Sequence, residues 1–125
     1  MVENCGRSQV YRKAYEFAIQ VVLTTRAVRE RTKEYLLFRQ LLRSGTSIGA
    51  NIAEANGAVS SADFSNKISI AYKETLETKY WLDVLMDCGI LEKKFYTTLY
   101  PRADEIGKML YAILKKTRFS ESFEH

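Results

Sequence analysis

Residues 44–58 read SGTSIGANIAEANGA, and the fold class depends on whether these glycines belong to a phosphate-binding loop or to a helix. A P-loop requires G-x-x-x-x-G-K-[ST], because the lysine and the hydroxyl complete the phosphate site. Here Gly45 and Gly49 are four residues apart and no lysine follows them. The dinucleotide-binding fingerprint G-x-G-x-x-G is also absent. The stretch is therefore not predicted to bind a phosphate.

The residues around this stretch separate into three faces when they are placed on a helix at about 100° per residue. The apolar face contains five residues: Leu37, Leu41, Ile48, Ile52 and Ala55. A second face carries small residues at every fourth position: Gly45, Gly49, Ala53 and Gly57. Each glycine inside a helix costs about 1 kcal/mol relative to alanine, and close approach of a neighbouring helix would offset that cost. The small-residue face therefore predicts tight helix–helix packing.

The third face of this helix is polar. It contains Ser47, Asn51 and Glu54, which can reach one another because they lie three and four residues apart. One interpretation is a surface strip or a structural hydrogen-bond network. The other is the lining of a groove or pore that identical subunits share in an oligomer. The residues alone leave both interpretations open.

Apolar residues recur at helical spacing in four blocks of the 125-residue chain, which contains six glycines and one proline. The pattern predicts helices over approximately 8–29, 34–56, 61–88 and 92–118. Gly57 and Gly89 follow the second and third blocks as stop signals. Short connectors make consecutive helices antiparallel. We therefore expect a single all-α domain that folds as an up-down-up-down antiparallel four-helix bundle.

Pro101 lies inside the fourth block, where it removes a hydrogen bond and costs about 3 kcal/mol unless the helix bends. The apolar stripe nevertheless stays in phase across the proline, from Leu99 to Ile106. We therefore predict a kink or a short lead-in turn at Pro101 rather than a break in the helix.

Charge is distributed unevenly along the chain, whose formal net charge is +4. Residues 1–43 carry nine basic and four acidic side chains, residues 44–92 carry three and seven, and residues 93–125 carry seven and four. The bundle would place the cationic first and fourth helices side by side. Four of their residues are candidate nucleic-acid contacts: Arg12, Arg26, Lys108 and Lys115. These residues also lie opposite the apolar stripes of their own helices, as ordinary solvated side chains do.

The residues needed for common catalytic and metal sites are missing from the sequence. The only histidine is His125, so neither a Ser-His or Cys-His pair nor a Glu-x-x-His di-iron motif is expected. Glu74 and Glu77 could face inward, but we expect a solvated pair beside Lys73 and Lys79. We therefore predict no enzyme activity, no cofactor and no metal.

The apolar runs of the sequence are shorter than the stretch of about 20 residues that a transmembrane helix requires. The first residues, MVENCGRSQVYRK, lack the apolar core of a signal peptide. We therefore expect a cytoplasmic protein with no membrane association.

Two segments of the chain carry a resemblance to a known family. TSIGANIAEA (46–55) and SSADFSNKISIAYKETLETKYWLDVL (60–85) resemble the four helix bundle proteins, whose founding members are encoded within intervening sequences of bacterial 23S rRNA genes. The family motif carries over onto six residues of this sequence: Ser47, Ile48, Asn51, Ile52, Ala53 and Glu54. A more distant resemblance is to the accessory proteins of diversity-generating retroelements, which are pentameric bundles that bind reverse transcriptase and nucleic acid.

The resemblance implies an up-down-up-down bundle that commonly assembles as a homopentamer with a central channel, and it implies no known enzyme activity. The aromatic residues Tyr72, Tyr80 and Trp81 independently indicate more buried surface than one small bundle needs. We therefore expect a non-enzymatic, homo-oligomeric protein associated with RNA or another nucleic acid. The alternative is an interaction scaffold whose groove or channel receives a partner protein.

Overall fold

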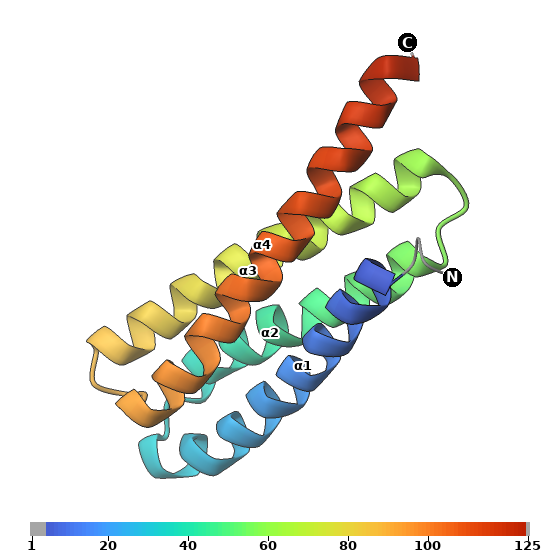
Figure 1. The fold of residues 1–125 in the computed structure, drawn as a ribbon. Coiled ribbons are helices and arrows are strands. Elements are labelled where there is room, and N and C mark those ends of the chain that lie inside the picture. The colour runs from blue at the N-terminus through green and yellow to red at the C-terminus, as the bar shows by residue number, and fades with distance from the viewer. Residues whose placement is uncertain (1–4, 125) are drawn as a thin grey trace.

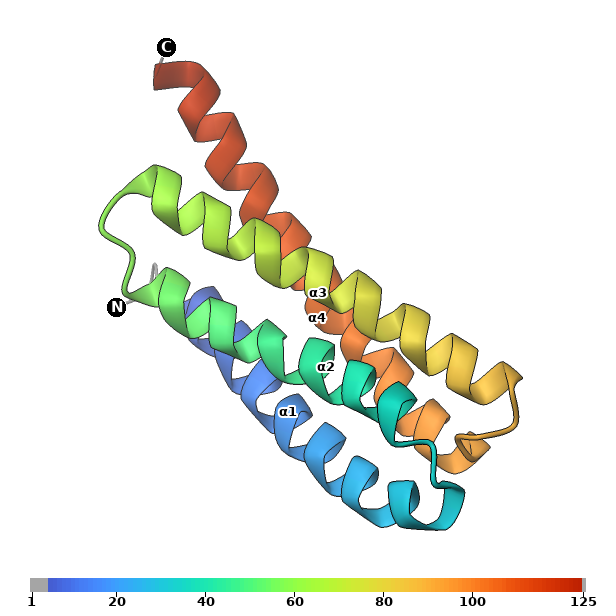
Figure 2. The ribbon, with the colours of Figure 1, turned by 180° about the vertical axis from the view of Figure 1, so that it is seen from behind.

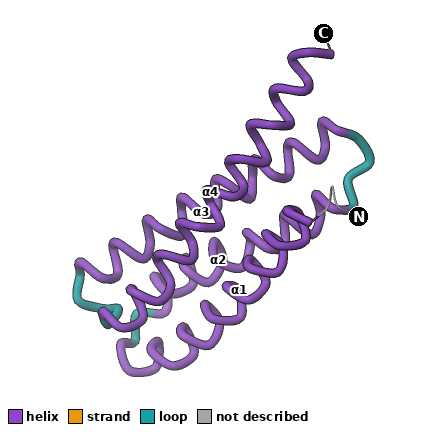
Figure 3. The backbone as a smooth tube through the Cα atoms, in the orientation of Figure 1, coloured by secondary structure: helices purple, strands orange, loops and turns teal. Residues whose placement is uncertain are grey.

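The chain folds into four helices joined by short loops. A computed structural model describes the backbone of residues 5–124 and the side chains of residues 9–117, so His125 lies outside the described residues. The helices are α1 (Cys5–Thr32), α2 (Tyr35–Asn56), α3 (Ser61–Asp87) and α4 (Lys93–Glu124) (Figure 1). No strand occurs between residues 5 and 124, which confirms the all-α prediction. The connecting loops are the short segments 33–34, 57–60 and 88–92 (Figure 3).

The four helices form a ring in which each helix packs against its two neighbours. α1 packs on α2, α2 on α3, α3 on α4, and α4 returns to α1, whereas the diagonal pairs make no close contact among the described residues. Consecutive helices run in opposite directions (Figure 2), so the predicted up-down-up-down topology is confirmed. The C-terminal end of α4 projects beyond the other three helices (Figure 1). This arrangement places α1 and α4 side by side.

The connections have local causes that the sequence carries. Ser60 caps the N-terminus of α3, because its hydroxyl accepts a hydrogen bond from the Asp63 backbone N–H at 3.0 Å. Gly89 follows α3 with a φ of +73°, a conformation that glycine adopts without steric cost. Pro101 lies within the continuous helix α4 and is exposed. The helix is therefore unbroken, and the interpretation of a separate lead-in turn is wrong.

The apolar face predicted for α2 enters the core with one change at its start. Leu41, Ile48 and Ile52 are buried, as expected, and Ala55 is buried with them. Leu37, however, is only half-buried, and the next residue, Phe38, is fully buried instead. Phe38 shares the lining of a small cavity with Thr25 and Arg29 of α1. The first turn of α2 therefore presents Phe38 toward α1, a contact that periodicity alone did not reveal.

The small-residue face of α2 contacts α1 over its first two members only. A Cβ atom added at Gly45 would lie 3.0 Å from Val21 Cγ2, and one at Gly49 would lie 3.6 Å from the Ala14 backbone. Ala53 is exposed, and Gly57 ends the helix as its C-cap. Within the chain, close contact with α1 is therefore limited to Gly45 and Gly49, and close packing at Ala53 and Gly57 stays a prediction. Residues four apart drift by about 40° around a helix, so the face rotates from α1 toward solvent.

Candidate functional site

The polar edge of α2 bonds to its own backbone and to α3. Ser47 Oγ donates to the Arg43 carbonyl at 2.6 Å, and Asn51 Nδ2 donates to the Ser47 carbonyl at 2.8 Å. Glu54 Oε1 pairs with Lys67 Nζ of α3 at 2.8 Å. Within one chain these contacts fit the first interpretation, a structural strip, and the lining of a pore shared by subunits stays a prediction. The family motif therefore combines two core residues, Ile48 and Ile52, with this strip and the exposed Ala53.

A charged cluster continues the same strip across the α2–α3 contact. Arg43 Nη1 donates to Glu74 Oε2 at 3.1 Å, and Arg43 Nη2 donates to Glu77. Trp81 Nε1 also donates to Glu77, at 3.3 Å. The expectation of a solvated carboxylate pair is therefore wrong, because the neighbouring helix supplies a guanidinium that reaches both. The hydrogen bond with Glu77 raises the pKa of Arg43. The guanidinium of Arg43 offsets one of the two carboxylate charges, and the donors of Arg43 and Trp81 are used within the cluster.

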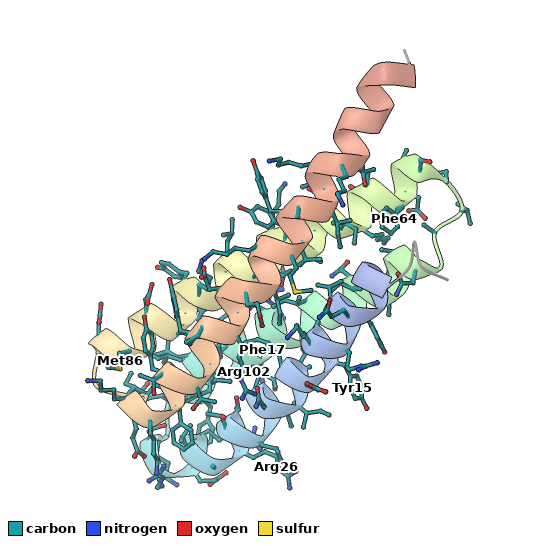
Figure 4. The ribbon with its side chains drawn as sticks, viewed as in Figure 1. Tyr15, Phe17, Arg26, Phe64, Met86 and Arg102 are labelled. Atoms are coloured by element: carbon teal, nitrogen blue, oxygen red, sulfur yellow. The ribbon has the colours of Figure 1, made fainter. Side chains whose placement is uncertain are left out.

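The four predicted nucleic-acid contacts are all exposed, and they lie on two helices, α1 and α4. Lys108 pairs with Asp104 at 3.2 Å and lines a groove between α3 and α4, and Lys115 Nζ lies 5.8 Å from the centroid of the Tyr111 ring. Arg12 and Arg26 lie on α1, where neither has a carboxylate partner among the described side chains. Figure 4 shows Arg26 pointing away from the bundle.

A groove between α1 and α4 is lined by cationic side chains that the sequence did not identify as candidate contacts. It has a volume of about 270 Å³, and its polar lining comes from Lys13, Glu16 and Gln20 of α1 and from Arg102 and Glu105 of α4. Lys13 Nζ pairs with Glu105 Oε1 at 3.4 Å. Arg102, which Figure 4 labels, has no ion pair within residues 9–117. We call these five residues the α1–α4 groove.

One polar atom in this groove has no hydrogen-bond partner. Gln20 Oε1 is buried and accepts no hydrogen bond from the described residues, so it is a free acceptor in the groove. The sequence does contain a signal for the groove, because Lys13 and Arg102 lie beside the apolar stripes of their helices rather than opposite them. That signal becomes specific only when α1 and α4 are known to be neighbours.

Charge on the α1–α4 side of the bundle is strongly positive. Among residues 9–32 and 93–117, these two helices carry eleven basic and four acidic side chains. Over residues 61–87, α3 carries three basic and five acidic side chains. An uneven distribution of this kind creates a positive potential over one side of the molecule, which attracts anionic partners.

No group of three or more His, Cys, Asp or Glu side chains gathers in the described part of the chain in a way that could hold a metal ion. None of the helices in that part is both long enough and apolar enough to span a membrane.

The fold and the site define the class of protein: an all-α four-helix bundle with a polar groove between its two most cationic helices, the first and the last. Residues 7–112 match the family described as 23S rRNA-intervening sequence protein, and the chain belongs to this family. The resemblance carried by residues 46–55 and 60–85 is thereby confirmed. No match was found among curated proteins.

A solved structure is similar to this chain along most of its length. It is the crystal structure of a protein with unknown function from the S23 ribosomal protein family of Bacteroides thetaiotaomicron VPI-5482. The two chains are 42% identical, the match covers 88% of this chain and 98% of the other, and the TM-score is 0.85.

Proposed function

We propose that this protein is a non-enzymatic, homo-oligomeric RNA-associated protein of the bacterial cytoplasm, and that the α1–α4 groove contacts the RNA backbone. The observation that carries the proposal is the unpaired Arg102 in a groove between the two most cationic helices. Guanidinium groups bind phosphates in bidentate geometry, and clustered cations gain affinity by releasing counterions. RNA is the first nucleic acid to test, because the family name refers to an intervening sequence of 23S rRNA.

The expected result is RNA binding that weakens steeply with salt. For each phosphate contact, the slope of log K against log salt is about −0.7 for a single strand and −0.9 for a duplex. Arg102→Gln should reduce the magnitude of this slope by about 1 and weaken binding several-fold at about 50 mM salt. The measurement is fluorescence anisotropy with labelled RNA over a series of salt concentrations.

Lys67→Gln is the matched control for this experiment. It removes the same charge from the opposite, α2–α3 side of the bundle, where Lys67 is paired with Glu54. We expect it to change the RNA affinity less than twofold, since a charge far from the interface is screened. The proposal fails if RNA does not bind at about 50 mM salt, or if the two variants weaken binding equally.

The oligomeric part of the proposal rests on two exposed surfaces. Tyr15, Ile19 and Leu23 are exposed along α1, and Figure 4 shows Tyr15 pointing away from the bundle. Tyr80 is exposed on α3, which lies diagonally opposite α1 in the ring. Identical subunits close a ring when two different surfaces of each subunit meet.

Charge supports the same pairing of surfaces. Arg12 and Arg26 lie without carboxylate partners among the exposed apolar residues of α1, whereas α3 is the acidic helix of the bundle. We therefore propose that the α1 surface of one copy docks on the α3 surface of the next, in a pentamer as the family resemblance suggested. A contact between RNA and Arg12 or Arg26 stays a prediction.

Light scattering on a sizing column tests the assembly, and absorbance at two wavelengths detects any nucleic acid that elutes with it. We expect a mass of about 72 kDa, five times that of the 14.4 kDa chain. Leu23→Glu should reduce the mass to that of one chain, because it places a charge in the interface. Leu36→Glu, at a more exposed position on α2, should leave the mass unchanged. A wild-type monomer, or equal dissociation of both variants, would contradict the assembly.

A further inference from the structure

A second groove lies between α3 and α4, and the two helices approach closely beneath it. Its volume is about 270 Å³, and its lining includes Tyr72, Tyr111 and Gly107. A Cβ atom added at Gly107 would lie only 2.9 Å from Thr75 Oγ1. Thr75 is fully buried, and its hydroxyl donates to the Tyr72 carbonyl at 2.6 Å, so it cannot easily move away. The floor of the groove is therefore closely packed and well defined.

Aromatic rings form one wall of this α3–α4 groove. The ring centroids of Tyr72 and Tyr111 are 5.6 Å apart, and the Tyr111 side chain is 48% exposed. Lys115 Nζ lies 5.8 Å from the centroid of the Tyr111 ring. An exposed aromatic ring beside a cation is the arrangement on which bases of single-stranded nucleic acids stack, since every base has a π-face.

Two lysines in the same groove share a single carboxylate. Lys79 Nζ lies 2.8 Å from Asp104 Oδ1, and Lys108 Nζ lies 3.2 Å from Asp104 Oδ2. The three groups together carry one net positive charge. Each ammonium group has three N–H donors, so donors remain for a further oxygen atom. The hydrogen bond between Lys79 and Asp104 raises the pKa of Lys79 and lowers that of Asp104, which keeps both groups charged at neutral pH.

We propose that the α3–α4 groove binds one nucleotide unit of single-stranded nucleic acid, with the base on Tyr111 and the phosphate at Lys79 and Lys108. A nucleotide joins a planar ring to an anion, which are the two chemistries that the groove complements. Sites for small molecules typically have volumes of about 300–1,000 Å³, and the groove, at about 270 Å³, lies just below this range, which limits it to one unit of a longer strand. The bases of a duplex are stacked on one another and cannot enter it.

This inference rests on the proposed RNA association and names the form of nucleic acid that the protein prefers. The test compares a labelled oligouridylate of about ten nucleotides with an RNA duplex of equal length, by fluorescence anisotropy. Tyr111→Leu keeps an apolar side chain against Tyr72 but removes the stacking ring. We expect it to weaken binding of the single strand about 5-fold or more and to leave duplex binding unchanged.

Tyr35→Leu is the matched control, because Tyr35 is 45% exposed and lies on α2 outside the groove. It should change neither affinity. If Tyr111→Leu leaves single-strand binding unchanged, the inference is wrong. If it changes the mass of the assembly while single-strand binding persists, the groove belongs to an interface between copies, which also overturns the inference.

For a second pair of variants we predict tighter binding of RNA, a result that a misfolded protein would not give. Asp104→Asn frees both lysines of the groove, whereas Glu105→Gln makes the same change of charge one residue later, in the α1–α4 groove. We expect Asp104→Asn to tighten single-strand binding several-fold more than duplex binding, and Glu105→Gln to tighten both equally. Equal effects of the two variants on both RNAs would overturn the inference even when Tyr111→Leu fails to fold.

Competition by uridine monophosphate distinguishes a site for a free mononucleotide from a site for one nucleotide within a strand. Displacement of the oligouridylate by the free nucleotide would identify a mononucleotide site, whereas resistance to it would identify a site that requires a strand. Either result supports a nucleotide in the groove, provided that the Tyr111→Leu effect is present. Duplex binding without a single-strand preference would remove this inference and leave the proposed RNA association intact.

Discussion

Replacing Phe38 with alanine is expected to lower the free energy of unfolding by about 3–5 kcal/mol. The Phe38 side chain is fully buried at the start of α2, so truncation removes a large apolar contact with the core. A small cavity lined by Thr25 and Leu42 already adjoins Phe38. Because these side chains do not fill the existing cavity, we expect them not to fill the larger space that truncation would leave. Urea denaturation followed by circular dichroism at one fixed protein concentration provides the measurement.

Leu36→Ala is the control for this substitution. Leu36 lies two residues earlier on the same helix and is 75% exposed, so its truncation should change the stability by less than about 0.5 kcal/mol. Equal losses from the two variants would mean that the first turn of α2 presents a different face to the core from the one described here.

Replacing Gly45 with leucine is expected to lower the free energy of unfolding by about 3 kcal/mol, the upper end of the usual cost of overpacking a core. Even a single added Cβ atom would lie 3.0 Å from Val21 Cγ2, and leucine adds three more carbon atoms in the same place. Either α1 and α2 must separate or Val21 must leave its rotamer, and both changes disturb the core. The same denaturation experiment measures the loss.

Gly49→Ala tests the same contact with the opposite expected sign. The added Cβ atom would lie 3.6 Å from the Ala14 backbone, an ordinary van der Waals distance, so no clash results. Alanine is also favoured over glycine inside a helix by about 1 kcal/mol. We expect a gain in stability of up to about 1 kcal/mol, and a loss comparable to that of Gly45→Leu would show that the helices lie closer than described.

Much of the fold could be predicted from the sequence because a helix is a local structure. The apolar spacing of Leu41, Ile48 and Ile52 predicted both the helix and the side that it buries. The stop signal at Gly89 marked the end of α3 correctly. Short connectors then left the antiparallel bundle as the simplest arrangement, so α1 and α4 had to be neighbours.

The candidate sites could be predicted only in part, because each depends on a pair of helices. The sequence identified Lys108 but not its partners, since the contacts with Asp104 and Lys79 require α3 and α4 to lie at a particular rotation and height. Arg102 looked like one cation among many until α1 was placed beside it. Glu77 looked solvated because its partner, Arg43, is more than thirty residues away in the chain.

The stretch SGTSIGANIAEANGA (44–58) separates what the sequence determines from what the tertiary structure decides. The sequence by itself determined that this stretch is helical and that Ile48 and Ile52 face the core, because the period of 3.6 residues is set within a single helix. Only the tertiary structure decided that Gly45 and Gly49 meet α1 while Gly57 does not. The reason is geometric. Each step of four residues turns the small-residue face by about 40° around the helix axis, and the angle at which α1 and α2 cross decides at which residue this face stops contacting α1.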